Sequence, residues 1–293
     1  MRVFITFLLI LFSLSAYSMP DQFNVYVPNS GVKNITCRAI FDMYGKKYNA
    51  NPVYMTKEGA AGMLAMLAMT SEKKFSVLCS GVSESLFNNS AFPGHEAEHK
   101  LLTMVTLYAT GPVTFYTGAD SKFTSINDLL TLDRPVTIGY HTSMHEIIVG
   151  IMFEGRKVVL VPYKSPNDAL PSLINGSLDM YTETGALEQM VTSGRLKSLG
   201  YINGNGNLYG ADITKKFPRI AQMPMFLAIT TSSNNDPKDI EELNHRLVEI
   251  VNSEEVSKVI KNIGWVPAGY SVKKSNELID RALKEIETSK HVK

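Results

Sequence analysis

Hydrophobic and polar residues follow two different periods along the chain, which predicts strands and helices in turn. Phe23–Val27, Pro52–Met55 and Phe75–Cys79 are short runs rich in β-favouring residues. Between them, apolar residues at helical spacing predict one helix over Ile35–Tyr44, and a run of Ala, Met and Leu predicts another over Gly59–Met69. This order of strands and helices predicts parallel strands joined by helical crossovers.

The same order restarts in the middle of the chain. Predicted strands cover Pro135–Tyr140, Val158–Val161 and Leu178–Tyr181, and predicted helices cover Ser143–Phe153, Pro166–Asn175 and Leu187–Ser193. Gly176 and Gly194 stand where the last two of these helices should stop. Two β-rich runs, Leu102–Tyr116 and Met223–Thr231, separate the units, and helices are predicted over Pro237–Asn252, Ser253–Ile263 and Lys274–Ser289.

These patterns predict an α/β protein with two Rossmann-like lobes. Residues 19–110 together with 226–293 are expected to form the first lobe, and residues 111–225 a second lobe inserted into it. The two connecting segments would then form a hinge with a cleft between the lobes. Ligands of open α/β sheets bind beyond the carboxyl ends of the strands, so the site is expected in that cleft.

Residues 1–18 have the three parts of a secretory signal peptide. Arg2 supplies the positive start, Val3–Leu14 is almost wholly apolar, and Ala16 and Ser18 are the small residues before a cleavage site. A membrane anchor is the alternative, but the apolar run of about 12 residues is shorter than the roughly 20 that span a bilayer. We therefore expect a periplasmic protein with a mature chain of about 275 residues.

Charge and cysteine content narrow the function further. The chain has 29 Lys and Arg against 28 Asp and Glu, and loss of Arg2 makes the two counts equal. Without a basic excess there is little to neutralise phosphates, so no nucleic acid partner is expected. Cys37 and Cys79 are the only cysteines. In an oxidising compartment they could pair, but both lie in apolar segments, where buried free thiols are an equally economical reading.

Several loops that open helices are candidates for anion binding. A helix start presents unpaired backbone N–H groups and the positive end of the helix dipole. Taken singly, such residues are more often ordinary caps and turns; their number favours a site. The candidate ligand-binding residues are Asn29, Ser30, Gly31, Lys33 and Asn34 after the first strand, Gly59, Ala60 and Ala61 at the second helix, Ser80 and Gly81 after the third strand, and Tyr140, His141, Thr142, Ser143, Tyr181 and Thr182 in the second lobe.

An enzyme reading rests on His95-Glu96-Ala97-Glu98-His99, which matches the H-E-x-x-H motif of zinc hydrolases. That motif needs a buried helix, whereas Pro93-Gly94 precedes it here and charged residues surround it, so a solvated surface segment is expected. A G-x-S-x-G elbow and a G-x-G-x-x-G after the first strand are both missing. We predict no catalytic residue, no metal site and no cofactor.

The segment Val161–Tyr181, VPYKSPNDALPSLINGSLDMY, resembles the signature of the solute receptors of tripartite tricarboxylate transporters, the Bug family. Matching positions are Val161, Pro162, Tyr163, Lys164, Ala169, Leu173, Gly176 and Asp179. Further similar elements follow the family order: Val27-Pro28 with Ile35 and Arg38, Gly59-Ala60-Ala61-Gly62, Ser143-Met144-His145, and Ser193–Leu199. Together they span nearly the whole mature chain.

The resemblance implies a type II periplasmic-binding-protein fold. It also implies ligands that are mostly carboxylates, held by backbone amides, small hydroxyls and water. The chain departs from the family in two loops: Asn29–Asn34 is shorter, lacks the family's Asp and contains Lys33, and Tyr140-His141-Thr142 replaces glycines. These changes make the site more positive, narrow the cleft and add a titratable donor.

The expected function is capture of a small organic anion by closure of the two lobes and its delivery to a membrane transporter. A monomer whose partners are transporter subunits is expected. A periplasmic receptor for a signalling partner would use the same chemistry and is the alternative, with the zinc hydrolase a more distant one.

Overall fold

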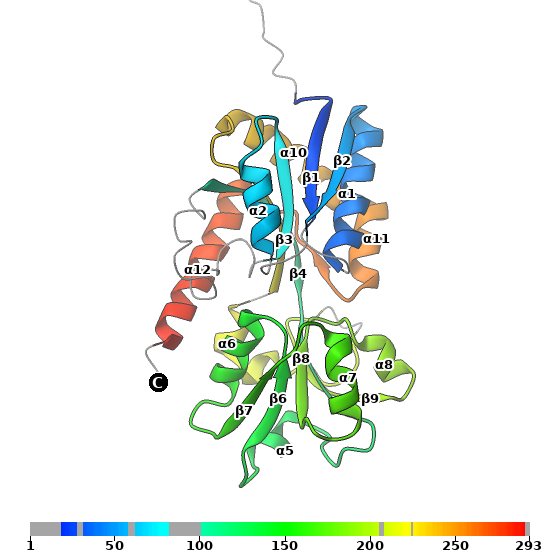
Figure 1. Cartoon of the computed structure of the whole chain (residues 1–293), viewed down its shortest axis with the longest axis vertical. Helices are drawn as coiled ribbons and strands as arrows, with labels where there is room; N and C mark the ends of the chain where they lie inside the picture. Colours follow the sequence, from blue (N-terminus) through cyan, green and yellow to red (C-terminus); the bar gives the residue numbers. More distant parts are fainter. Residues whose placement is uncertain are drawn as a thin grey trace, which may run out of the picture.

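The structure, a computed structural model, describes residues 19–27, 32–57, 62–81, 101–204, 208–223 and 225–290. The strands and helices fall into two lobes, one above the other in Figure 1. The predicted signal peptide, residues 1–18, lies outside the described residues.

The first sheet has the strand order β11-β4-β10-β3-β1-β2. Its strands are β1 (Gln22–Val27), β2 (Asn51–Thr56), β3 (Ser76–Gly81), β4 (Leu102–Gly111), β10 (Met225–Ser232) and β11 (Val266–Pro267). Its helices are α1 (Val32–Tyr48), α2 (Met63–Thr70), α10 (Pro237–Val251), α11 (Glu254–Asn262) and α12 (Val272–Lys290). β1 is parallel to both β2 and β3, which confirms the crossover pattern predicted from the sequence.

The second sheet has the order β7-β6-β8-β5-β9. Its strands are β5 (Val113–Gly118), β6 (Val136–Tyr140), β7 (Val158–Pro162), β8 (Met180–Glu183) and β9 (Leu196–Ile202). The segments around it are α5 (Ile126–Leu130), α6 (Ser143–Met152), α7 (Pro166–Ile174), α8 (Glu188–Thr192), a short 3₁₀ helix η3 (Thr214–Lys216) and α9 (Pro218–Ala221). β6 is parallel to β7 and β8, and β5 is antiparallel to β8 and β9.

Some element limits differ from the prediction. The third strand was expected to end at Cys79, but β3 continues through Ser80 and Gly81 because both pair with β10. The second helix was expected from Gly59, whereas α2 begins at Met63, after Gly62 in a left-handed conformation (φ 93°). A backbone of that shape interrupts a right-handed helix and suits glycine.

The β-rich run Leu102–Tyr116 is divided between the two sheets at Pro112. β4 ends at Gly111 and β5 begins at Val113, and the chain returns to the first sheet between Ile202 and Met225. Gly111 pairs with Met225, so the outgoing and returning segments are neighbours in one ladder. The lobe limits predicted at residues 110/111 and 225/226 stay a prediction.

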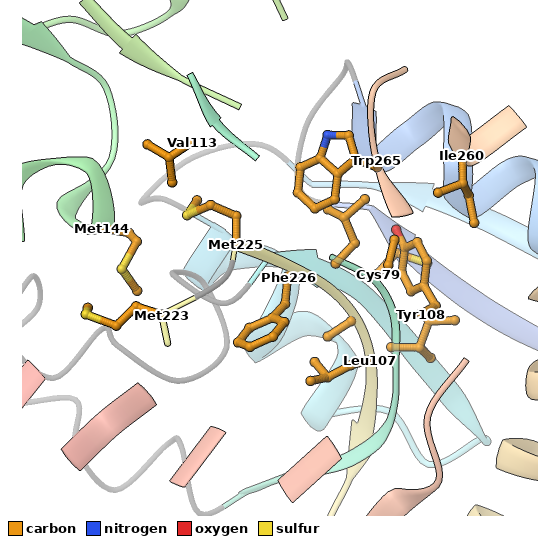
Figure 2. Packing of buried hydrophobic residues seen from close by; sticks show 14 of the residues in the cluster. Cys79, Leu107, Tyr108, Val113, Met144, Met223, Met225, Phe226, Ile260 and Trp265 are labelled. Carbon is orange, nitrogen blue, oxygen red and sulfur yellow. The ribbon is translucent and has the colours of Figure 1, made fainter. Parts of the chain in front are cut away.

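One hydrophobic cluster runs through both lobes. Met144 of α6, Met223 and Met225 belong to the same cluster as Trp265 and the first-lobe core (Figure 2). Methionine is flexible and polarisable, so a methionine-rich border tolerates small shifts of its two sides. α12 also reaches from the first lobe to α6 (Figure 1).

Cys37 of α1 and Cys79 of β3 form a disulfide with a Cα–Cα distance of 6.1 Å. Both residues are fully buried. The bond therefore joins the first turns of α1 to the carboxyl end of β3, and it resolves the two readings that the sequence left open.

Candidate functional site

The carboxyl ends of the first-sheet strands lie at the border between the lobes. β10 begins at Met225, opposite Gly111, where the chain leaves for the second sheet. β3 runs antiparallel to β10 and its last residue, Gly81, pairs with Leu227 near that border. β1 and β2 are parallel to β3, so they end at the same edge.

The second sheet presents its carboxyl ends to the same border. The indole Nε1 of Trp265, from the segment before β11, donates a hydrogen bond to the backbone oxygen of Thr184, directly after β8, at 3.2 Å. β6 is parallel to β8, so Tyr140 at the end of β6 lies at this edge with Glu183. Strand ends from both lobes therefore meet at one border, and ligands of open α/β sheets bind beyond such strand ends.

Thr142 caps the start of α6. Its backbone is extended (φ −133°, ψ 152°), and its side chain accepts a hydrogen bond from the backbone N–H of His145 at 3.3 Å. The same oxygen, Oγ1, lies 2.8 Å from Nδ1 of His145. This arrangement starts the helix directly after β6 and points its positive end toward the border.

His141 contacts two residues of β8 through one ring nitrogen. Its Nδ1 is 3.0 Å from Oε2 of Glu183 and 3.1 Å from the hydroxyl of Tyr181. The contact with Glu183 has the distance of an ion pair without the alignment of a hydrogen bond. The His141 side chain is 20% exposed and that of Glu183 only 3%. We call these three residues the His141 cluster.

Glu183 is fixed from its other side. Its Oε1 accepts hydrogen bonds from the backbone N–H and the hydroxyl of Thr184 at 2.8 and 2.9 Å. Its backbone oxygen accepts one from Thr114 at 2.9 Å. With Oε1 occupied, Oε2 is the atom left to act on His141.

His145 and Thr182 carry buried polar atoms without a partner. Among the described residues, Nε2 of His145 and Oγ1 of Thr182 have no hydrogen-bond partner. Burial holds the pKa of His145 well below its ordinary value, and the neighbouring His141, with ring centroids 4.9 Å apart, lowers the pKa further. His145 is therefore neutral at physiological pH.

Aromatic rings form a wall behind His141. The Tyr181 ring stacks on His141 at a centroid distance of 6.3 Å and meets Tyr163 edge-on at 6.2 Å. Tyr181 reaches β6 only because residue 139 is glycine: a Cβ there would lie 2.7 Å from its ring. Burial, and then the charge of Glu183, raise the pKa of Tyr181, so its hydroxyl stays protonated.

In the first lobe, Lys33 and Asn34 lie in the first turn of α1. The side-chain oxygen of Asn34 accepts a hydrogen bond from Nε of Arg38 at 2.7 Å, and the Arg38 guanidinium lies 4.3 Å from the Tyr54 ring centre. The side-chain oxygen of Asn34 is therefore used in a hydrogen bond within the protein. Lys33 lies at the start of α1, next to the border between the lobes.

The predicted site residues divide into three groups. Tyr140, His141, Thr142, Tyr181 and Thr182 come together in the second lobe; Lys33, Asn34, Ser80 and Gly81 lie on the first; and Ser143 is placed by its backbone at the start of α6. The remaining predicted positions lie outside the described residues: Asn29, Ser30, Gly31, Gly59, Ala60, Ala61 and the His95–His99 motif.

Two contributors were not among the predicted ligand residues. Glu183 lies two residues beyond the predicted strand Leu178–Tyr181, and that position was the available signal. Asp179, a position of the family signature, has a structural role: its carboxylate accepts hydrogen bonds from both terminal guanidinium nitrogens of Arg134 at 2.7 Å and from the N–H of Thr137 at 2.9 Å. Tyr163 was recognised as a motif position, and its place after β7 was the available signal.

Within the described ranges, no group of three or more His, Cys, Asp and Glu side chains could hold a metal ion. None of the helices in these ranges is long and apolar enough to cross a bilayer.

No protein-family model and no curated protein sequence matches the chain, but solved structures share its fold. R. palustris Rpa4515 with adipate has a TM-score of 0.75 and 15% identity, covering 92% of this chain and 96% of that one. MatC (Rpa3494) from Rhodopseudomonas palustris with bound malate has a TM-score of 0.73 and 12% identity, covering 92% and 100%. The periplasmic binding protein BugD has a TM-score of 0.72 and 14% identity, covering 94% and 98%.

At these identities the likeness concerns the fold. The chain has the two-lobed α/β fold of Bug-type periplasmic binding proteins, which confirms the fold that the sequence resemblance implied. Among the similar structures, BugD is a periplasmic binding protein, a protein from Polaromonas is a TctC solute binding protein, and two others hold malate or adipate.

Proposed function

We propose that this protein is an extracytoplasmic solute-binding protein that captures a small organic anion, a carboxylate, between its lobes and delivers it to a membrane transporter. The observation that carries the proposal is the meeting of strand ends from both sheets at one border, with the start of α6 and the His141 cluster on the second lobe. It rests also on the fold shared with structures that hold adipate and malate.

The chemistry at the border suits a carboxylate. The starts of α1 and α6 offer backbone N–H groups and positive dipole ends, Lys33 adds a cation at the first, and His141 adds a donor at the second. In this proposal the first-lobe loops hold one end of the ligand, and Thr142 and Ser143 with the His141 cluster close on the other.

Closure follows as a shift between open and closed populations. A ligand that contacts both lobes binds the closed form better and therefore enriches it. The adjacent crossings at Gly111 and Met225 and the methionine-rich border support a rotation of one lobe against the other. The closed form is the state that a membrane partner would recognise.

A thermal-shift screen tests the proposal. Mature protein, unfolded and refolded to remove bound ligand, is heated with malate, adipate, citrate, aromatic acids, amino acids and zinc. A ligand at 100 times its Kd stabilises by about 2.7 kcal/mol, a rise in Tm of roughly 5–10 °C at this size. A large shift with one class of carboxylate supports the proposal, whereas a shift with zinc alone supports the metal-site alternative.

An uptake experiment separates transport from sensing. Cells that lack the gene should lose uptake of the carboxylate identified by the screen, and the wild-type gene should restore it. Unchanged uptake together with a lost transcriptional response to the same carboxylate would favour the signalling receptor.

A further inference from the structure

His141 is held at Nδ1 and open at its other nitrogen. Glu183 and Tyr181 both approach Nδ1, while Nε2 makes no hydrogen bond to a described residue and the side chain remains partly exposed. The strand registers produce this geometry, because Gly139 of β6 pairs with Tyr181 of β8. With Nδ1 facing Glu183 and Tyr181, Nε2 is the nitrogen left for a ligand, and it is a donor in the charged ring.

Three of the described groups around His141 keep their protonation state near neutrality. On α6, His145 stays neutral because burial lowers its pKa. Glu146 lies on the exposed side of the same helix. Burial and Glu146 raise the pKa of Tyr140, which precedes His141. From β8, Tyr181 stays protonated, and Glu183 is the carboxylate in contact.

The net charge of His141 and Glu183 together determines whether the second lobe attracts or repels an anionic ligand. With His141 neutral, Glu183 leaves a net negative charge at the border, which repels an anion. With His141 protonated, the pair is neutral, Nε2–H points away from Glu183, and the dipole of α6 adds a positive end. An anionic group that approaches this site therefore favours the protonated ring.

We propose that His141 binds the distal, anionic end of the ligand through Nε2–H and takes up a proton when it does so, with Glu183 and Tyr181 as positioning residues. The inference rests on the proposed function and names the specificity-determining residue of that site. Histidine is suited to this role because it titrates between pH 5 and 8.

Calorimetry in two buffers of different ionisation enthalpy measures the proton directly. The probe is adipate, or the dicarboxylate of the screen with the largest shift, at pH 6.5–8.0, where both its carboxylates are ionised. We expect binding to take up a proton, and each proton taken up lowers the affinity by about tenfold per unit rise in pH.

Three variants assign the proton. His141→Gln should abolish the uptake and flatten the pH dependence, and Glu183→Gln should move the rise in affinity to lower pH. His245→Gln, on the exposed face of α10, is the matched control and should behave as wild type. Far-UV circular dichroism checks that each variant folds. If a variant does not fold, the proton uptake measured with wild-type protein tests the proposal by itself.

The outcomes separate the two proposals. If no carboxylate of the screen binds, the proposed function fails. If a dicarboxylate binds to wild type without proton uptake, or if His141→Gln keeps the uptake, the proposed function stands and the role of His141 is overturned.

Discussion

Trp265 joins the two lobes through Thr184: its Nε1 donates to the backbone oxygen of Thr184 at 3.2 Å, one residue beyond Glu183. The same indole ring packs against Gly111, the last residue of β4. One side chain thus contacts both Gly111, where the chain leaves the first sheet, and Thr184, next to the His141 cluster.

Trp265 should report ligand binding by fluorescence, because it is the only tryptophan of the chain and lies at the border. Closure changes the surroundings of the indole, so adding the carboxylate of the screen should produce a saturable change in emission. The midpoint should match the Kd from calorimetry. An unchanged spectrum at saturation would mean that the border around Trp265 does not move.

Gly111→Ala should destabilise the protein. An added Cβ would lie 2.7 Å from three ring carbons of Trp265, and overpacking of this kind costs about 1–3 kcal/mol. Gly150→Ala is the matched control: it lies in α6 with nothing within 4 Å, and should stabilise by about 0.5–1 kcal/mol. Urea unfolding measures both. Equal effects would contradict the close packing of Trp265 on β4.

Lys33→Ala should weaken binding of the carboxylate about tenfold or more, because charge-assisted hydrogen bonds contribute about 1.5–3 kcal/mol. Lys46→Ala is the matched control, since Lys46 lies at the other end of α1 with a side chain 72% exposed. Calorimetry at fixed pH compares the two. An unchanged affinity in Lys33→Ala would remove Lys33 from the site.

Asp179→Asn should destabilise the protein in a pH-dependent way. Burial favours the neutral carboxyl, but the hydrogen bonds from Arg134 and Thr137 outweigh it, so the pKa of Asp179 lies below its ordinary value. A lowered pKa in the folded state contributes stability above the unfolded pKa of about 3.9, and this is lost as pH falls through the folded pKa.

The free energy of unfolding of Asp179→Asn should therefore be lower than that of wild type by about 1–2 kcal/mol from pH 7 to about 5. This difference should shrink below about pH 4. Urea midpoints at several pH values measure it. The exposed Asp120→Asn serves as the control and should change little at any pH. A loss that is constant down to pH 3 would contradict the role given to Arg134.

Local pattern was sufficient to predict most of the fold. The strands β1 to β3 and β6 to β8, and the helices between them, follow from periodicity and from stop residues such as Gly176 and Gly194. The sequence analysis puts a limit between the lobes inside one β-rich run, at residues 110/111, but the break between the two sheets at Pro112 depends on the pairing of β4 with β10 and of β5 with β9, far away in the chain. β9 itself, Leu196–Ile202, was read only as a family motif.

The candidate site was predicted less completely, for the same reason. Tyr140, His141 and Thr142 could be named because they follow a strand and precede a helix. The partnership of His141 with Glu183 depends on the register of β6 against β8, about 40 residues apart, which no local pattern contains. The disulfide is similar: composition allowed it, and only the approach of α1 to β3 determines it.

The Cys37–Cys79 bond has a consequence for control of the protein from outside. It connects the helix that carries Lys33 to the strand that ends at Gly81, and both elements belong to the first lobe. Both sulfurs are fully buried, so a thiol in the buffer can reduce this bond only after the first lobe has opened. A solute that is removed by unfolding the protein should therefore be removed without reductant, because the intact bond limits the conformations of the unfolded first lobe and favours its refolding.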